Sequence, residues 1–201
     1  MARRSKGIPL KPIIVIYCEG ESEKAYFEML KRKYHATTVH TEKIAVESIG
    51  IKGMPLLQKA VRKIQKLQKK KKIDQSYVVF DRDDLSRSEL QQCEKFANEN
   101  RIQILFSSIN IEIWILMHFQ TVNRAYQASE LNQILSGKDF FDTDYRRFKG
   151  ASYDHFLFDR VKTAMINANR LEKGQSKPWY DCNPYTNIND FITKIFNVTE
   201  F

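Results

Sequence analysis

The stretch Y-V-V-F-D-R-D-D at residues 77–84 joins a run of apolar, strand-forming side chains to a sudden cluster of acids. Its apolar half is continuous, which predicts a central strand covered on both faces, as in parallel sheets. Asp81, Asp83 and Asp84 follow at the end of that strand, where ligands bind in open α/β sheets. Neighbouring carboxylates repel one another unless a cation, water or basic side chains compensate. The alternative is structural: the acids cap a turn or the next helix, and nothing binds.

A second apolar strand pattern also ends in acids. I-I-V-I-Y at 13–17 is followed by C-E-G-E-S-E at 18–23. Gly20 permits a tight turn, and Ser22 is a plausible helix cap. Acids in a first helical turn are also favoured by the helix dipole, so Glu23 has an explanation that needs no ligand.

The apolar periodicity predicts alternating strands and helices over the first half of the chain. We expect strands at 13–17, 39–46, 77–80 and 102–106, and helices after Ser22 and over 54–72 and 86–100. This alternation indicates an α/β fold with a parallel sheet of about four strands flanked by helices. The pattern beyond residue 108 is mostly helical, with helices expected at 111–119, 129–135, 159–172 and 186–196.

Length and composition restrict the organisation of the chain. With 201 residues, 42% of them hydrophobic, it can bury a full core. We expect a basic N-terminal arm at 1–11, a core at 12–120 and a helical C-terminal extension at 121–201 packed on that core.

Cysteine content and hydropathy favour a soluble, cytoplasmic protein. Cys18, Cys93 and Cys182 are odd in number and lack C-x-x-C spacing, which suits a reducing compartment and argues against a disulfide framework or a zinc site. We find no signal-peptide pattern. The apolar segment 111–119 is too short to span a bilayer, so no membrane association is expected.

Basic residues indicate a polyanionic partner. The formal charge is +9, which favours nucleic acid, although an excess of lysine also occurs in proteins that are merely soluble. The candidate contacts to a nucleic-acid backbone are Lys66, Lys69 and Lys70 at the end of helix 54–72, and Arg146, Arg147 and Lys149 in a predicted loop. A run of charges is more often a solvated face, and cations at a helix C-terminus are favoured by its dipole.

The two acidic strand ends are far apart in sequence but are expected to meet in space. If the topological switch point of the sheet lies between the first and third strands, Glu19 faces Asp81 and Asp83 across adjoining strand ends. Carboxylates of this kind suit Mg²⁺, with Mn²⁺ able to substitute, and not zinc. Such an ion would neutralise a phosphodiester during its transfer. Glu112 lies in the apolar segment 111–119, where a charge is costly unless it is paired or bound to metal.

Four motifs carry a resemblance to a known family. They are C-E-G-E-S-E-K-A-Y-F at 18–27, F-D-R-D-D at 80–84, I-N-I-E-I-W-I-L-M-H-F at 109–119 and N-P-Y-T-N-I at 183–188. A glutamate after the first strand and D-x-D after the third resemble the Toprim fold of topoisomerases, primases and overcoming-lysogenization-defect nucleases. The four motifs together are most similar to the RloB-like proteins encoded near restriction and abortive-infection loci, and they run along most of the chain.

This resemblance implies a Toprim-like core and a Mg²⁺-dependent nuclease acting in phage defence, often beside an ATPase. Glu19 would be a metal ligand or the general acid or base, and Asp81 and Asp83 would be metal ligands. The supporting groups would be Glu23 and Asp84, which could also hold a second ion, with Glu112 and His118 in the third motif. The chain has Asn110 and Ile111 where the family usually has Pro and Phe. This departure concerns the local turn and not the acids.

Other functions remain open on the sequence alone. The second hypothesis is a noncatalytic nucleic-acid-binding or sensor subunit that acts through an ATPase partner. A D-x-D sugar transferase would leave the positive charge and the glutamate motif unexplained. His118, alone on an apolar face, is more often a satisfied core residue than a ligand. The choice between DNA and RNA, and the oligomeric state, are not determined by these patterns.

Overall fold

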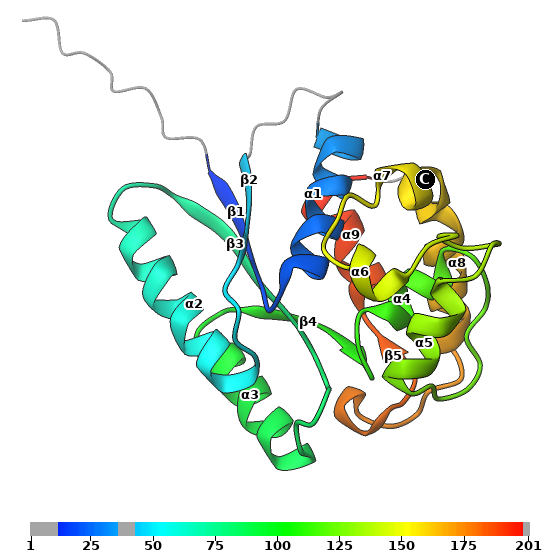
Figure 1. Cartoon of the computed structure of the whole chain (residues 1–201). Helices are drawn as coiled ribbons and strands as arrows, with labels where there is room; N and C mark the ends of the chain where they lie inside the picture. Colours follow the sequence, from blue (N-terminus) through cyan, green and yellow to red (C-terminus); the bar gives the residue numbers. More distant parts are fainter. Residues whose placement is uncertain (1–11, 36–42, 199–201) are drawn as a thin grey trace, which may run out of the picture.

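The computed structural model describes residues 12–35 and 43–198 (Figure 1). Its centre is a five-stranded sheet in the order β2-β1-β3-β4-β5. The strands are β1 (Ile13–Cys18), β2 (Lys43–Ser48), β3 (Ile73–Asp81), β4 (Gln103–Ser108) and β5 (Tyr185–Thr186). The expected basic arm at 1–11 and the first residues of the expected strand 39–46 lie outside the described residues.

The first four strands are parallel, and β5 pairs with β4 in the antiparallel direction. The parallel α/β sheet predicted from the sequence is therefore confirmed, and a short fifth strand extends it. From β1 the chain adds β2 on one side, and it then crosses back to add β3 on the other side of β1. The order in which strands are added therefore reverses between β1 and β3. This reversal is the topological switch point at which ligands bind in such folds.

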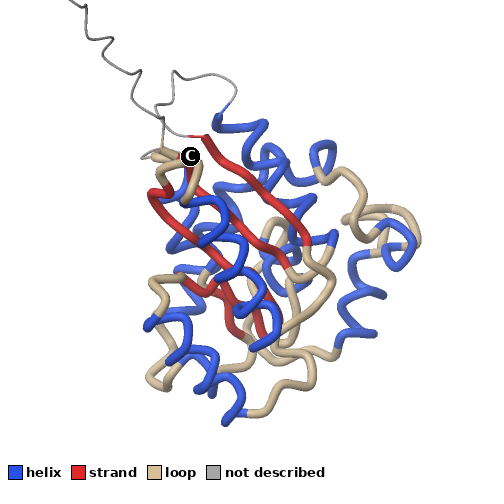
Figure 2. Tube along the Cα trace, turned by 90° about the vertical axis from the view of Figure 1, so that its left-hand side faces the viewer, coloured by secondary structure: helices blue, strands red, loops and turns tan. Residues whose placement is uncertain are grey.

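Helices cover both faces of the sheet (Figures 1 and 2). Alternate residues of a strand point to opposite faces. Ile14 and Ile16 belong to the core that includes residues of α1 (Glu21–His35) and α9 (Ile188–Phe196), whereas Val15 packs in the core on the other face. That second core contains residues of α2 (Gly53–Gln68) and α3 (Arg87–Glu99). Burial on both faces explains why β1 and β3 are apolar without alternation.

The helix ends match the sequence in part. Ser86 caps α3 in a reciprocal arrangement with Glu89. The expectation for Ser22 is wrong, because α1 already begins at Glu21 and Ser22 lies in its first turn. The expected helix 54–72 ends at Gln68, so Lys69 follows the helix as its C-cap residue and Lys70 lies beyond it.

The C-terminal part is mainly helical, as expected. Its elements are α4 (Glu112–Met117), α5 (Ala128–Leu135), α6 (Tyr145–Phe148), α7 (Asp154–Leu157), η1 (Phe158–Arg160), α8 (Val161–Glu172) and η2 (Trp179–Asp181). Arg146 and Arg147 lie in α6, a single helical turn, and not in a loop as predicted. The core on the α1 side of the sheet continues into this part through Trp114, Val161 and Ile192.

Two further expectations concern cysteines and membranes. All three cysteines are buried free thiols, as their irregular spacing predicted. None of the helices in residues 12–35 and 43–198 is long and apolar enough to cross a membrane.

Candidate active site at the switch point of the sheet

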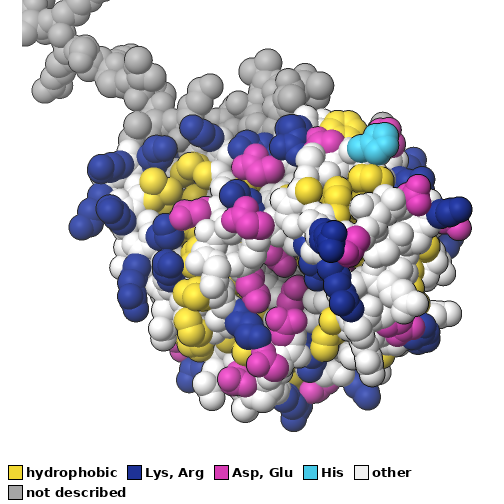
Figure 3. Space-filling view, viewed as in Figure 1, with side chains coloured by type: hydrophobic (Ala, Val, Ile, Leu, Met, Phe, Trp, Pro, Cys, Tyr) yellow, Lys and Arg dark blue, Asp and Glu magenta, His cyan; other side chains and the backbone are white. Residues whose placement is uncertain are grey.

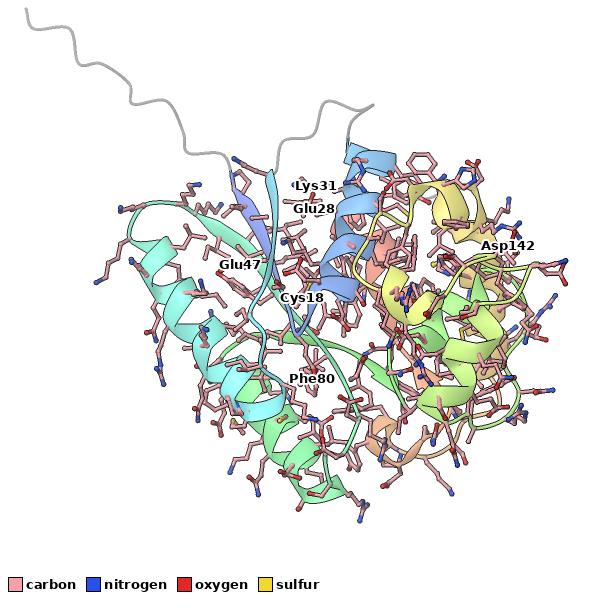
Figure 4. The ribbon with its side chains drawn as sticks, viewed as in Figure 1. Cys18, Glu28, Lys31, Glu47, Phe80 and Asp142 are labelled. Atoms are coloured by element: carbon pink, nitrogen blue, oxygen red, sulfur yellow. The ribbon has the colours of Figure 1, made fainter. Side chains whose placement is uncertain are left out.

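The ends of β1 and β3 bring Glu19 beside Asp81. The two strands are parallel neighbours, with Cys18 paired to Val79. The Glu19 backbone N–H donates to the Val79 carbonyl at 2.9 Å, and Glu19 Oε2 accepts from the Asp81 backbone N–H at 3.4 Å. Cys18, labelled in Figure 4, is the last residue of β1 before this acid. The strand ends that carry the two acids are therefore adjacent, and the Glu19 carboxylate contacts the Asp81 backbone.

Asp81 is the most enclosed acid of the D-x-D motif. Its side chain is buried, and the Ile111 backbone N–H donates a hydrogen bond to it. Burial raises the pKa of Asp81 well above its ordinary value, and repulsion from Glu23, Glu112 and Glu19 adds to this effect. Asp81 therefore lies at the centre of four mutually repelling carboxylates, which we call the acid cluster: Glu19, Glu23, Asp81 and Glu112.

Glu23 reaches the acid cluster from the first turn of α1. It is 5% exposed, and its Oε2 accepts the Gly20 backbone N–H at 2.9 Å. Burial raises the pKa of Glu23 to about 7, with repulsion from Glu112 and Glu19 adding to the increase. The helix dipole alone does not account for this residue, because a carboxylate placed only for the dipole would remain in water. For Glu19 the pKa is also raised, first by burial.

Glu112 is the first residue of α4 and is only 2% exposed. The ammonium group of Lys149 lies 3.0 Å from Glu112 Oε1, an ion-pair contact without hydrogen-bond geometry. A charged carboxylate is costly in the interior unless it is paired. Lys149 is therefore the counter-ion of Glu112 in the buried acid cluster. The sequence predicts only that it belongs to a basic loop that contacts nucleic acid.

Asp83 and Asp84 lie at the mouth of the acid cluster. Asp83 adopts a left-handed backbone conformation with φ of 42°, and its N–H donates to the Ile109 carbonyl at 3.1 Å. The ammonium group of Lys52 lies 3.5 Å from Asp83 Oδ2 and also pairs with Asp84. Asp83 and Asp84 both add to the raised pKa of Glu19, although the side chain of Asp84 is 83% exposed.

The donor chemistry of these residues fits a hard divalent cation. Carboxylate oxygens are what Mg²⁺ selects, and Glu19, Asp81 and Asp83 would hold it. Two buried oxygens, Asn110 Oδ1 and Glu112 Oε1, accept no hydrogen bond in the described part of the chain. Within that same part, no three acidic, histidine or cysteine side chains already form a group that could hold a metal. The ligands would therefore have to draw together when an ion binds.

His118 lies in the core and not at the acid cluster. It is fully buried, its Nε2 lies 3.1 Å from the Tyr26 hydroxyl, and its Nδ1 lies 3.0 Å from the Trp114 carbonyl oxygen. Burial lowers the pKa of His118 to about 4, so its ring is neutral at physiological pH. Both ring nitrogens are engaged, which agrees with a satisfied core histidine and corrects the supporting role given to it from the third motif.

The predicted nucleic-acid contacts fall into two separate regions. Lys66, Lys69 and Lys70 lie at the end of α2 that leads into β3, opposite the acidic strand ends. The 16 residues of α2 give a separation of about 24 Å along the helix. Arg146 and Arg147 are exposed on α6, immediately before Lys149. In Figure 3, acidic side chains gather in the middle of the face, with basic side chains at its left edge and to its right.

Comparison with known proteins identifies the family. The model of the RloB-like protein family matches residues 14–195, which is nearly the whole chain. The chain belongs to the RloB-like family. The match spans all four motifs that suggested this family, including the strand ends that carry Glu19 and Asp81. No curated protein and no solved structure matches the chain.

Two positively charged residues of this RloB-like site were not recognised as counter-ions from the sequence. Lys52 follows Gly50 in the connection after β2, and Gly50 N–H donates to the Glu19 carbonyl at 2.8 Å. This bond fixes the connection against the acidic strand end. From the sequence, Lys52 could have been recognised as a site residue only because it lies soon after a strand of the predicted parallel sheet, where ligands bind. Nothing in the sequence connects Lys149 with Glu112.

Proposed function

We propose that this RloB-like protein is a metal-dependent nuclease that hydrolyses a phosphodiester in DNA or RNA with Mg²⁺, or Mn²⁺ in its place. The observation that supports this most strongly is the acid cluster at the switch point. Its carboxylates come from the end of β1, from α1, from β3 and from α4, and the pKa values of Glu19, Glu23 and Asp81 are raised. Carboxylates whose pKa values are perturbed by burial and by one another mark candidate active sites when they lie in such a position.

In this proposal, different residues of the chain carry out different parts of the reaction. Glu19, Asp81 and Asp83 would hold the ion, whose charge would stabilise the negative charge developing on the phosphoryl group. A water molecule attacks phosphorus while the bond from phosphorus to the leaving oxygen breaks, and that oxygen takes a proton from solvent. Glu19 or Glu23 accepts the proton of that water. The pKa of Glu23, about 7, suits proton transfer at neutral pH. Lys52, at the mouth, is placed to pair with a phosphate oxygen.

The arrangement also suggests a path for the substrate. A strand leaving the acid cluster along α2 would reach Lys66 and Lys70 after about 24 Å, or about 7 nucleotides at 3.4 Å each. In this proposal, Arg146 and Arg147 contact the backbone on the other side. The role in phage defence and the ATPase partner belong to the proposal through the family resemblance alone.

Cleavage assays with matched variants test this function. A panel of end-labelled DNA and RNA substrates is incubated with Mg²⁺, Mn²⁺ or EDTA, and the product ends are sequenced. Glu19→Gln and Asp81→Asn should abolish metal-dependent cleavage while the variants stay folded. Glu99→Gln is the matched control, since this exposed acid is the last residue of α3 and lies away from the acid cluster. If Glu19→Gln and Asp81→Asn both cut at the parental rate, the proposal is wrong.

A noncatalytic sensor or binding subunit of an ATPase-containing complex is the second candidate. One observation favours it: Asp83 is paired with Lys52 and Glu112 with Lys149, and in the described residues no three acids already form a metal-holding group. A protein of this kind would shift a labelled oligonucleotide at every Mg²⁺ and Mn²⁺ concentration and never consume it.

A further inference from the structure

A pocket of about 880 Å³ adjoins the mouth of the acid cluster. Lys52, Asp83 and Asp84 contribute to its lining, and the segment before α5 contributes Arg124 and Tyr126. Half-buried Ile109 and exposed Asn183 add an apolar and a polar surface. Its volume lies within the range of about 300–1,000 Å³ that is typical of pockets for small organic groups. The proposed chemistry does not use Arg124, Tyr126, Ile109 or Asn183.

Several contacts hold the planar guanidinium group of Arg124 in place in this pocket. Its guanidinium carbon lies over the Tyr126 ring, 4.0 Å from the centroid, in a cation–π contact. Nη1 donates to the Ala125 carbonyl and to Glu130 Oε2 at 3.1 and 3.2 Å, and Nη2 donates to Glu130 Oε1. The side chain is nevertheless 55% exposed.

These contacts restrict what Arg124 can bind. A phosphate is recognised by the edge of a guanidinium group, where its N–H donors lie. Glu130 and the Ala125 carbonyl engage three of the five N–H donors of Arg124, and Glu130 also offsets its positive charge, so the group is a weakened partner for a phosphate. A planar ring, in contrast, stacks on the face of a guanidinium and needs none of those donors. The flat surface of a nucleobase fits this arrangement better than a phosphate does.

We infer that this pocket receives one unpaired base of the nucleic-acid strand, stacked on the guanidinium plane of Arg124, beside the phosphate presented to the acid cluster. This inference rests on the proposed nuclease function and adds a position at which the substrate is recognised. Asn183 offers an amide to the edge of that base, and Ile109 offers an apolar contact. A base held here must be out of the duplex, so single-stranded or locally opened substrates are favoured over intact duplexes.

An abasic scan tests the inference. Single-stranded 12-mers of DNA and of RNA, each lacking one base at a different position, are bound to the full-length protein in Ca²⁺ and followed by fluorescence anisotropy. Stacked bases each contribute enough that one abasic position should weaken binding by about 5- to 150-fold. The variants are Arg124→Ala and Arg124→Lys, the second of which keeps the positive charge but has no planar group. In both, the same abasic position should weaken binding by less than about twofold. Glu130→Ala, which frees the edge of the guanidinium, should give an intermediate penalty.

The controls separate stacking from charge and from folding. Arg101→Lys makes the same change at an exposed residue just before β4, at the other end of the sheet, and should keep the wild-type abasic pattern. Melting curves of each variant show whether it is folded. A free 5′-mononucleotide serves as competitor. If it displaces the 12-mer while no abasic position matters, the pocket takes a free nucleotide and the inference is overturned.

The outcomes distinguish this inference from the proposed function, because binding in Ca²⁺ needs no catalysis. If an Arg124-dependent position exists but no substrate is cut in Mg²⁺ or Mn²⁺, the base pocket is supported and the nuclease assignment fails. If substrates are cut but no abasic position depends on Arg124, the base pocket is wrong and the nuclease stands. If no strand binds at all, both are wrong.

Discussion

Neutralising Glu23 should stabilise the protein in a pH-dependent manner. The pKa of Glu23 is about 7 in the folded chain and has an ordinary value of 4.5. Below pH 4.5 both states hold the proton and the group has no effect. As the pH rises to about 7, the unfolded state loses its proton first, so the folded state is progressively destabilised. Above pH 7 the full cost is present.

The size of this cost follows from the two pKa values. A difference of about 2.5 pH units corresponds to about 3 kcal/mol. Glu23→Gln keeps an oxygen to accept the Gly20 N–H but removes the charge. At pH 8 without divalent ions we expect Glu23→Gln to be more stable than wild type by about 3 kcal/mol, or roughly 6–12 °C in Tm. At pH 4.5 the two proteins should differ by less than about 1 kcal/mol.

Thermal and urea unfolding of both proteins in EDTA, at pH 4.5 and pH 8, provide the measurement. Glu28→Gln is the matched control on the same helix. Its Oε2 lies 3.1 Å from Lys31 Nζ at the surface, and Figure 4 labels both residues. A surface pair of this kind contributes about 0–1 kcal/mol. If Glu23→Gln is no more stable than wild type at pH 8, Glu23 does not belong to a cluster of buried repelling carboxylates, and the electrostatic description of the site is refuted.

Three further predictions follow from the same contacts. Lys149→Met should destabilise the protein by about 1–3 kcal/mol because Glu112 loses its counter-ion, and adding Glu112→Gln should restore most of that loss in urea unfolding; a double variant as unstable as Lys149→Met would contradict the pairing. Lys66→Glu combined with Lys70→Glu should weaken binding to 20-mers and reduce the salt slope by about 2, with little effect on 5-mers too short to reach them; equal losses for both lengths would contradict the path along α2. Ser86→Ala should cost about 1 kcal/mol, since it removes the cap of α3, and an unchanged Tm would show that the cap does not stabilise the helix.

Much of the fold could be predicted because its causes are local. The uninterrupted apolar runs of β1 and β3 reflect helices on both faces of the sheet. Acids directly after each run mark the strand ends. From these features follow the parallel sheet, the switch point and the meeting of Glu19 with Asp81.

The features that the sequence did not predict depend on contacts between distant segments. Lys149 contacts Glu112 only because α6 packs near the start of α4, and no local pattern records that approach. The two residues of β5 are too few to give a periodic signal, and they form a strand by pairing with β4. His118 was ambiguous because an apolar helix face looks the same whether its histidine bonds to a ligand or to Tyr26.

The position of the lysine run also required the structure. Composition shows that the chain is basic, but only the direction of α2 places Lys66 and Lys70 at the edge of the sheet remote from the acids. These lysines therefore lie away from the acid cluster. A contact to substrate outside the cleavage position remains the relevant hypothesis.

The most direct test of a metal site at the switch point is cleavage of the protein chain by bound iron. Fe²⁺ takes the place of Mg²⁺, ascorbate and peroxide generate hydroxyl radicals at the ion, and the cut positions in the chain are mapped by mass spectrometry. We expect cuts near residues 19–23, 81–83 and 110–112, suppressed by excess Mg²⁺ and lost in Asp81→Asn. Cuts elsewhere in the chain, or cuts at these positions that Asp81→Asn leaves unchanged, would show that these carboxylates do not share an ion.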